Sequence, residues 1–245
     1  MDPRQKREYD ELNRIAKTYD DHDFDTAMRG YMMRSLSPFF LEGKALELGC
    51  FKGDFTELLA KRFADLTVVD AAEEFIEHTR KRVGDKVRFI NSLFETFDVP
   101  DRFASIFCMH TLEHLDDPVA VLRKASASLR DDGRMFLVVP NAFAPSRQIA
   151  VKMGILPSLT ALSEADVKHG HRRTYTFDTL EKDARAAGLE VFHHGGVFFK
   201  PLANFQFNEL MGGKVISPEY MEGCYQLGME YPQLCASLFL VCTKG

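Results

Sequence analysis

Short runs of apolar residues recur through the first part of the chain, each long enough for a buried strand but too short for a helix. They cover residues 45–48, 66–69, 87–90, 105–109 and 134–139. Segments with the apolar spacing of amphipathic helices separate them, at 54–62, 72–83 and 118–129. This alternation predicts a parallel sheet with right-handed crossovers and helices on both faces.

The alternation loosens in the second part of the chain. Residues 141–175 show no clear strand pattern, 177–187 have helical spacing, and 190–199 and 236–243 have the pattern of two final strands. Between these strands lies a segment rich in Pro and Gly, 200–235. We expect the two irregular segments to be insertions over the carboxyl ends of the strands, where loops close over a substrate.

The predicted architecture is an α/β fold with a mostly parallel, seven-stranded sheet and an added cap of helices and loops. The sheet domain covers residues 44–245 and includes the two insertions. Residues 1–43 precede the first strand and contain helical patterns at 4–17 and within 18–43. We interpret this segment as an N-terminal helical cap.

The amino-acid composition supports one large domain and argues against nucleic acid and membranes as partners. The chain has 245 residues, of which 45% are hydrophobic and 27% charged, so it can bury a substantial core. Its net charge is −5 and it has no dense Lys/Arg block, which argues against nucleic acid as a partner. No apolar run has the length of a membrane span or of a signal-peptide core. The five cysteines form no CxxC pair and indicate buried, reduced thiols, so we expect a cytoplasmic protein without a membrane partner.

The first chemical signal is a strand that runs into a turn with two glycines, LELGCFKG at 46–53. Glycine allows a positive φ angle and lets a ligand approach the backbone closely. About twenty residues later a second strand ends in Asp70, whose carboxylate suits the two hydroxyls of a ribose. Nicotinamide-dependent oxidoreductases share this layout. However, the spacing Gly49-x-x-x-Gly53 and the carboxylate of Glu47 favour a cationic ligand over a pyrophosphate.

With these motifs the chain resembles the class I S-adenosylmethionine-dependent methyltransferases, which have a Rossmann-like fold. The matching stretches are LELGCFKG at 46–53, VVD at 68–70, HTLEHLDDP at 110–118 and LRDDGRMFLVVPN at 129–141. The form of the third stretch is similar to that of the ubiquinone-type O-methyltransferases, which act on small molecules. The resemblance implies that S-adenosyl-L-methionine is the methyl donor and that a small molecule is the acceptor.

The resemblance also implies a set of donor-binding residues. In the family, the acidic residue and glycines of the first motif hold the methionine part of the donor, and the acid after the second strand holds the ribose. The chain departs from the family pattern at Phe51, where the family has a glycine, and at 91–92, where Asn and Ser replace an acidic residue. The expected donor-binding residues are Glu47, Gly49, Cys50, Phe51, Gly53, Asp70, Ala71, Ser92, Leu93, Phe94 and His110. The alternative roles are structural, with Asp70 as a helix cap and Glu113 as a core carboxylate that caps a loop.

Histidines near the fourth strand allow two further interpretations. His110 and His114 follow that strand, and His169 and His171 lie in the first insertion. The four histidines together form a conceivable metal site. We favour instead a general base that removes a hydroxyl proton, with His114 or His171 ahead of His110, and no metal.

The polar segment 168–175, KHGHRRTY, is the predicted acceptor site. An Arg there suits a carboxylate or phosphate on the acceptor. The expected acceptor-binding residues are His169, Arg172, Arg173, Tyr175 and Asn141. Tyr19 and His22, ahead of the sheet, are candidates to close over the sulfonium.

These features predict an enzyme that transfers a methyl group from S-adenosylmethionine to a small acceptor, with O-methylation preferred. N- or C-methylation, a nucleotide-dependent oxidoreductase, and a non-catalytic binding protein of the same fold remain the alternatives. The sequence does not indicate the acceptor's identity or an oligomeric state.

Overall fold

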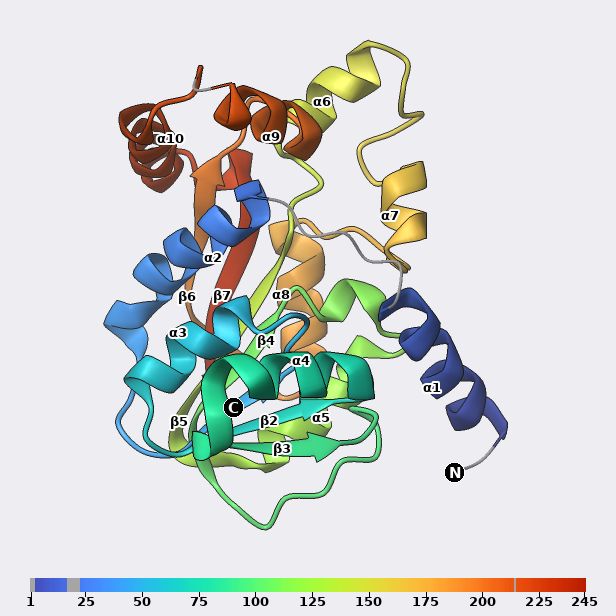
Figure 1. The fold of residues 1–245 in the computed structure, drawn as a ribbon, viewed down its shortest axis with the longest axis vertical. Coiled ribbons are helices and arrows are strands. Elements are labelled where there is room, and N and C mark those ends of the chain that lie inside the picture. The colour runs from blue at the N-terminus through green and yellow to red at the C-terminus, as the bar shows by residue number, and fades with distance from the viewer. Residues whose placement is uncertain (1–2, 17–22, 214) are drawn as a thin grey trace.

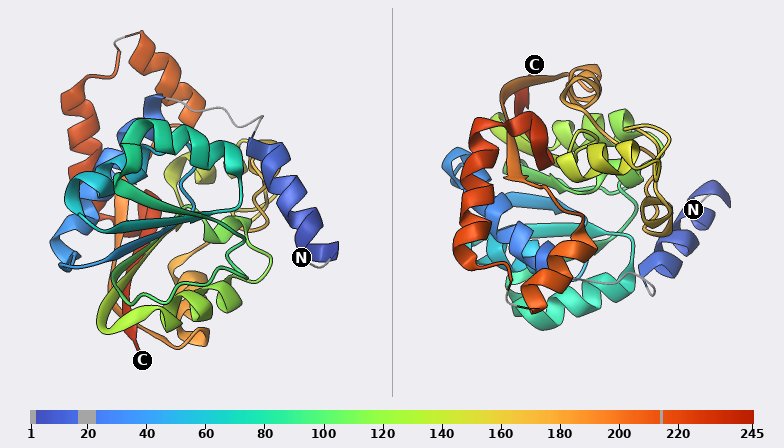
Figure 2. Two further views of the ribbon diagram at one scale, coloured as in Figure 1. Left: turned by 60° about the horizontal axis from the view of Figure 1, so that its bottom comes forward. Right: turned by 90° about the horizontal axis from the view of Figure 1, so that it is seen from above.

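A single twisted sheet of seven strands forms the centre of the molecule, with helices on both sides (Figures 1 and 2). The structure is a computed structural model that describes residues 3–16, 23–213 and 215–245. The strand order is β3-β2-β1-β4-β5-β7-β6, and β7 runs antiparallel to both of its neighbours. The strands are β1 Ala45–Leu48, β2 Leu66–Asp70, β3 Val87–Asn91, β4 Phe103–Met109, β5 Leu129–Pro140, β6 Leu189–Phe199 and β7 Cys235–Lys244.

The helices that connect the parallel strands occur where the sequence predicts them. They are α3 Asp54–Arg62, α4 Glu73–Val83, α5 Pro118–Ala127 and α8 Phe177–Ala186. The mostly parallel sheet with helices on both faces is therefore confirmed. The largest difference in a strand boundary is at β5, which begins at Leu129 rather than at Arg134. Leu129 pairs with Phe103, and the register of the β4–β5 pair then shifts. The irregularity interrupts the apolar pattern, so the sequence did not indicate the first residues of β5.

Two apolar layers hold the helices against the sheet. Along β4, Phe107 and Met109 face one layer and Ile106 and Cys108 face the other, as the two-residue period of a strand requires. The first layer also contains buried residues of α2 Asp23–Leu36, α3 and α10 Pro218–Glu230, and the second contains those of α5 and α8. All five cysteines are buried and unbridged.

Short helices fill both segments that lack strand patterning. Residues 141–175 contain α6 Pro145–Lys152 and α7 Glu164–Lys168, and residues 200–235 contain α9 Asn204–Gly212 and α10. Figure 1 shows α6, α9 and α10 at the same end of the molecule. A backbone hydrogen bond of 3.2 Å from Ser146 N to Lys200 O joins the two segments.

The N-terminal segment contributes two helices. Helix α2 packs on the sheet through Phe24, whose ring stacks on Phe207 of α9 at 4.4 Å. Helix α1, Pro3–Ala16, lies beside α4 (Figure 1). Tyr19 and His22 lie outside the described residues. No helix in the described part of the chain has the length and apolarity that crossing a membrane requires.

Candidate active site

The glycine turn after β1 needs glycine at two positions because other chain segments approach closely. Gly49 and Gly53 have φ angles of 89° and 87°. A Cβ atom at Gly53 would lie 2.8 Å from Cγ2 of Thr79 on α4, and a Cβ atom at Gly49 would lie 3.2 Å from Oγ1 of Thr111. The turn thus packs closely between α4 and the end of β4. This packing fixes the backbone of the turn in a conformation that a ligand can approach.

Phe51 keeps the backbone shape of the turn although it carries a side chain. Its φ angle of 46° is left-handed, which costs a residue with a Cβ atom about 1–2 kcal/mol. Its ring packs edge-on against Phe75 of α4, with ring centroids 5.1 Å apart. The departure from the family pattern therefore adds an aromatic group at the turn without opening it. The contact of Phe51 with a donor stays a prediction.

Asp70 links the end of β2 to the glycine turn. Its Oδ2 accepts a hydrogen bond from Cys50 N and its Oδ1 accepts one from Ala72 N, each 2.8 Å long. Burial raises the pKa of Asp70, and the backbone donors oppose this shift. Each oxygen retains a further lone pair, so the carboxylate can still accept bonds from ribose hydroxyls. The N-cap of α4 is Ala72, without a side-chain cap, so the capping alternative for Asp70 is wrong, and its donor-binding role stays a prediction.

Glu47 is a buried carboxylate, and one of its two oxygens has no hydrogen-bond partner. Only 1% of the residue is exposed, and its Oε2 atom has no hydrogen bond. Burial raises its pKa to about 8. An unpaired buried carboxylate is costly, and a cationic ligand would remove that cost. The site therefore fits the ammonium and sulfonium groups of S-adenosylmethionine.

Helix α1 covers the edge where the ribose and adenine of a donor are expected. The Tyr9 hydroxyl donates to Oδ1 of Asn91 at 3.0 Å, and the Asn13 side chain donates to the Ala71 carbonyl at 3.4 Å. These contacts are long-range, so no spacing in the sequence pointed to Tyr9 or Asn13.

The expected adenine-binding residues continue this edge beyond β3. Ser92 N donates to the Asp70 carbonyl at 3.0 Å, which fixes the chain after β3. Leu93 is buried, and Cζ of Phe94 would lie 3.6 Å from a Cβ atom at Gly49. Phe94 therefore lies next to the glycine turn and Ser92 next to Asp70, and the contact of Ser92, Leu93 and Phe94 with the adenine stays a prediction.

Arg29 of α2 is a cation that the sequence analysis missed. Burial raises the pKa values of Glu47 and Glu113, and the positive charge of Arg29 opposes both shifts. Arg29 follows the buried Met28 in α2. Its position beside the apolar face of this helix was the one feature of the sequence that could have indicated an inward-facing cation. The guanidinium is suited to the carboxylate of a bound amino acid group.

His110 adopts a constrained conformation at the end of β4. Its φ angle is 53°, and its backbone N–H donates to the Val138 carbonyl at 2.8 Å. Its Nε2 atom lies 2.9 Å from Oγ of Ser237 on β7. Burial lowers the pKa of His110 well below its usual value, which keeps the imidazole neutral. Ser237 has no motif in the sequence and enters the site through the pairing of β5 with β7.

His171 forms a pair with Asp166, which the sequence analysis did not include. Nδ1 of His171 lies 3.2 Å from Oδ1 of Asp166. Asp166 is itself held by Ser163, whose N and Oγ atoms both donate to its Oδ2 at 2.8 Å, and by Arg147 at 3.1 Å. Burial alone would lower the pKa of His171, but the bond to Asp166 and the charge of Glu113 raise it.

Glu113 and His114 face His171 across two loops. Glu113 is 1% exposed, and neither carboxylate oxygen has a hydrogen-bond partner. Burial raises its pKa to about 7. The rings of His114 and His171 meet edge-on, with centroids 4.7 Å apart, and burial lowers the pKa of His114 to about 3. One ligand atom from each of these three residues lies within 4.8 Å of the others.

The predicted histidine set is therefore only partly assembled. His114 and His171 come together, whereas His110 and His169 are outside this three-residue group in the part of the chain that the structure describes. The ring of His169 lies 6.3 Å from that of His171. The group therefore contains the carboxylate of Glu113, whereas the sequence analysis had predicted a group of histidines alone.

The remaining acceptor candidates differ in their surroundings. Arg172 forms an ion pair with Asp116, and Arg173 donates to the Asp116 carbonyl at 3.1 Å, so both join the first insertion to the loop before α5. Tyr175 is buried and donates to Asp183 at 3.1 Å. The Asn141 amide donates to two backbone carbonyls of the loop before β7. Tyr175 and Asn141 thus have structural contacts, and their roles toward an acceptor stay predictions.

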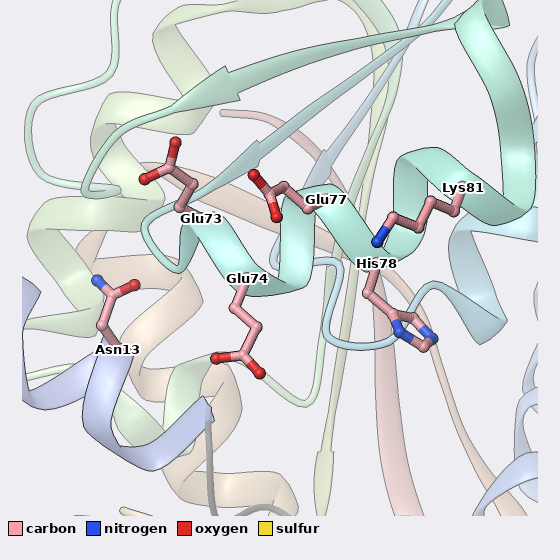
Figure 3. A pocket seen from close by; sticks show the side chains of 6 residues that line it. All are labelled: Asn13, Glu73, Glu74, Glu77, His78 and Lys81. Atoms are coloured by element: carbon pink, nitrogen blue, oxygen red, sulfur yellow. The ribbon is translucent and has the colours of Figure 1, made fainter.

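A surface hollow between α1 and α4 lies outside this site (Figure 3). Its lining is made of exposed polar side chains on the outer side of α4, together with Asn13 of α1. Those from α4 are Glu73, Glu74, Glu77, His78 and Lys81. The sheet-facing side of α4, with Ile76 and Thr79, is buried. We interpret the hollow as a solvated helix face.

Comparisons with known proteins agree with this geometry. A family model described as a methyltransferase domain matches residues 20–194. A ubiquinone biosynthesis O-methyltransferase from Aeromonas salmonicida is 29% identical over 183 residues, which cover 73% of this chain and 74% of that protein. Among solved structures, a possible histamine N-methyltransferase from Thermotoga maritima has a TM-score of 0.62 at 17% identity, covering 99% of this chain and 97% of that one. An N-methyltransferase from Bradyrhizobium japonicum, in complex with S-adenosyl-L-homocysteine, has a TM-score of 0.58 at 15% identity, covering 96% and 97%.

The family model covers well over half of the chain, and the two structures share its fold across nearly the whole length. This match is to a methyltransferase family, which supports a methyltransferase over the nicotinamide-dependent alternative. The glycine turn, Glu47 and Asp70 remain the predicted donor-binding residues. The chain therefore belongs to the methyltransferase-domain family and is an S-adenosylmethionine-dependent methyltransferase.

Proposed function

We propose that this enzyme transfers the methyl group of S-adenosylmethionine to a hydroxyl oxygen of a small molecule. The pairing of His171 with Asp166, next to Glu113 at the end of β4, is the observation that carries the proposal. The name of the Aeromonas relative, an O-methyltransferase, supports the same reaction class.

The chemistry of the acceptor explains why this pair matters. The acceptor oxygen forms a bond to the methyl carbon while the carbon–sulfur bond breaks and its electron pair returns to sulfur. A hydroxyl must lose its proton in this reaction, whereas a neutral amine attacks through its lone pair before it loses one. With Nδ1 of His171 donating to Asp166, Nε2 carries the free lone pair and serves as the proton acceptor. A buried basic group is therefore more useful to O-methylation than to N-methylation.

The remaining residues position the two substrates. Glu47, Asp70 and the glycine turn hold the donor, and Arg29 pairs with its carboxylate. Segments 1–43, 141–175 and 200–235 form the cap that excludes water from the reacting groups. His169, Arg172 and Arg173 at its inner edge contact the acceptor.

Methyl-labelled donor and a matched acceptor panel test this proposal. A phenol, a catechol and an aniline of similar size are incubated with the enzyme, and the products are read by mass spectrometry. We expect label on the oxygen acceptors and a loss of about a hundred-fold in rate for His171→Ala. The matched control is His194→Ala, because His194 also pairs with a carboxylate, Glu181 at 3.1 Å, but on the exposed edge strand β6. Transfer to the aniline alone, or equal rates for both variants, would contradict the proposal.

A further inference from the structure

We propose that the ammonium of Lys200 binds a carboxylate on the methyl acceptor, which makes the acceptor a hydroxylated monoanion. The inference names the acceptor class of the proposed function and rests on that function. Lys200 follows β6 directly, at the point where the second insertion begins. Its side chain is partly buried, so it is removed from bulk water and still open to a ligand.

The ammonium of Lys200 has fewer partners than it can bind. In the described part of the chain its Nζ atom donates one hydrogen bond, to Oδ1 of Asn204 at 2.6 Å, and forms no ion pair. An ammonium has three donors, so two remain for a ligand. Burial lowers the pKa of Lys200 to about 8, which is the effect expected for a cation that is removed from water without a counter-ion.

The nearby carboxylates have other partners. The negative charges of Asp25 and Asp166 both raise the pKa of this ammonium. However, Oδ1 of Asp25 accepts a hydrogen bond of 2.9 Å from the side-chain amide of Asn204. Asp166 pairs with His171 and Arg147. Neither carboxylate is therefore the direct counter-ion of the ammonium, and that position is open to the acceptor.

The charge of Lys200 acts on the groups around the methyl-transfer site. It lowers the pKa of His110 at the end of β4. It is in turn stabilised by Asp166, which is the partner of the proposed base His171. Lys200 is thus close enough for its charge to reach both the end of β4 and the base. An acceptor held by its carboxylate at Lys200 can therefore present a hydroxyl to His171 in a fixed orientation.

The backbone at Lys200 is fixed from several sides. Its carbonyl accepts a hydrogen bond of 3.2 Å from Ser146 N at the start of α6. Two residues earlier, Phe198 has a left-handed φ angle of 68°. Helix α10 packs closely here, because a Cβ atom at Gly228 would lie 2.9 Å from Phe199 N. Strained backbone that packing holds in place often occurs at ligand-binding sites, and a fixed backbone lowers the cost of ordering the site.

The surroundings favour a carboxylate over a phosphate. One ammonium beside Asp25 and Asp166 balances a single negative charge, whereas a phosphate dianion would also meet repulsion from both carboxylates. The Nζ atom of Lys200 lies 5.9 Å from the centre of the Phe24 ring, which stacks on Phe207. An apolar surface next to the cation suits an acceptor with an aromatic body and one charged end.

The test compares probes that share one ring: meta-hydroxyphenylacetate, its uncharged amide, meta-hydroxybenzyl phosphate and meta-aminophenylacetate. Calorimetry measures their binding to the full-length protein in complex with S-adenosylhomocysteine, so the result does not depend on methyl transfer. We expect the wild type to bind meta-hydroxyphenylacetate roughly ten- to a hundred-fold more tightly than the amide. Lys200→Met should reduce this ratio to about one, and Lys200→Arg, which keeps the charge, should retain part of it.

The matched control is Lys152→Met, because Lys152 is an exposed lysine at the end of α6 in the same cap. This variant should keep the wild-type ratio. Melting curves and the affinity for S-adenosylhomocysteine establish that each variant is folded. The comparison of acid and amide in the wild type needs no substitution, so it decides the question even if Lys200→Met does not fold.

The inference is overturned if the wild type binds meta-hydroxyphenylacetate no more tightly than the amide, if Lys200→Met keeps the wild-type ratio, or if the phosphate ester binds more tightly than the carboxylate. Turnover separates it from the proposed function. If the Lys200-dependent preference is present but methyl is transferred only to the nitrogen of meta-aminophenylacetate, the carboxylate site stands and the proposed function fails. If the acid and the amide are O-methylated with equal kcat/KM and bind equally, the proposed function stands and the inference fails.

Discussion

The carboxylate of Asp70 accepts a 2.8 Å hydrogen bond from the backbone N–H of Cys50, 20 residues earlier in the chain. This bond connects the end of β2 to the glycine turn after β1, so the side chain that shapes the turn is also the one predicted to bind the donor's ribose. A change at Asp70 is therefore expected to affect the donor's affinity and the stability of the fold together.

For Asp70→Ala we expect the affinity for S-adenosylhomocysteine to fall by at least ten-fold, because charge-assisted hydrogen bonds contribute about 1.5–3 kcal/mol each. Isothermal calorimetry gives the affinity, and a thermal melt gives the smaller loss of stability. The control is Asp65→Ala, which removes an exposed carboxylate whose partner, Lys44, lies 3.7 Å away. Unchanged affinity in Asp70→Ala would argue against ribose binding at this position.

Donor binding should depend on pH through Glu47. Its pKa is about 8 in the free protein, and the ionised form is the one that pairs with the donor's ammonium. Binding therefore releases a proton below pH 8, and affinity should rise by up to about ten-fold per pH unit between pH 6 and 8. Calorimetry in buffers of different ionisation enthalpy measures the proton release. Glu47→Gln should bind weakly at every pH, and a wild-type affinity that is flat with pH would contradict this assignment.

The contribution of Glu113 to the stability of the protein should fall as pH rises. Glu113 has a pKa of about 7 in the folded state, above its ordinary value of 4.5, so the folded state binds more protons between these values. The contribution of Glu113 to the free energy of unfolding is therefore greatest below pH 4.5, and it is lost as pH rises through 7. Glu113→Gln should melt several degrees higher than the wild type at pH 8, and at nearly the same temperature at pH 5. A variant that is less stable at pH 8 would show that the carboxylate has a partner in the fold.

Gly53→Ala should destabilise the protein through a specific contact. The new Cβ atom would lie 2.8 Å from Cγ2 of Thr79, and the backbone is left-handed there. Gly84→Ala is the matched control, because its φ angle is also positive but no atom lies within 4 Å of the added Cβ. Urea denaturation should show a larger loss for Gly53→Ala, and Thr79→Ala in that background should recover part of it. Equal losses of stability in the two variants would mean that backbone strain, and not the contact with Thr79, causes the destabilisation.

Helix α1 should slow the exchange of donor. The Tyr9 hydroxyl donates to Asn91 at 3.0 Å over the expected adenine edge. A neutral hydrogen bond contributes roughly 0.5–1.5 kcal/mol, so Tyr9→Phe should raise the dissociation rate of S-adenosylhomocysteine by about two- to ten-fold. Surface plasmon resonance measures this rate, with the exposed Tyr231→Phe as the control. If removal of residues 1–16 leaves the rate unchanged, α1 is not a cover for the donor.

Much of the donor half of the site was predictable from local sequence. A strand, a turn with two glycines and a helix follow one another within residues 45–62, and continuous apolar runs mark β1 and β2 because both faces of these strands are buried. Asp70 was recognisable since it ends the next strand. Tyr9, Asn13 and Arg29 were not, because they reach the site from helices whose packing no short-range pattern encodes.

The acceptor half was decided by tertiary structure. The sequence grouped four histidines, and the fold instead joins His114 and His171 to Glu113. The pairing of His171 with Asp166 depends on the capping box that starts α7, and the contact of His110 with Ser237 depends on β7 pairing beside β5. The sequence by itself determines the strands, the glycine turn and the donor class, because those follow from neighbouring residues and from one repeating period. The grouping of Glu113, His114 and His171 depends instead on how two loops that are distant in sequence pack against each other. Packing of the assembled fold, and not separation along the chain, decides which side chains lie within a few ångströms of one another.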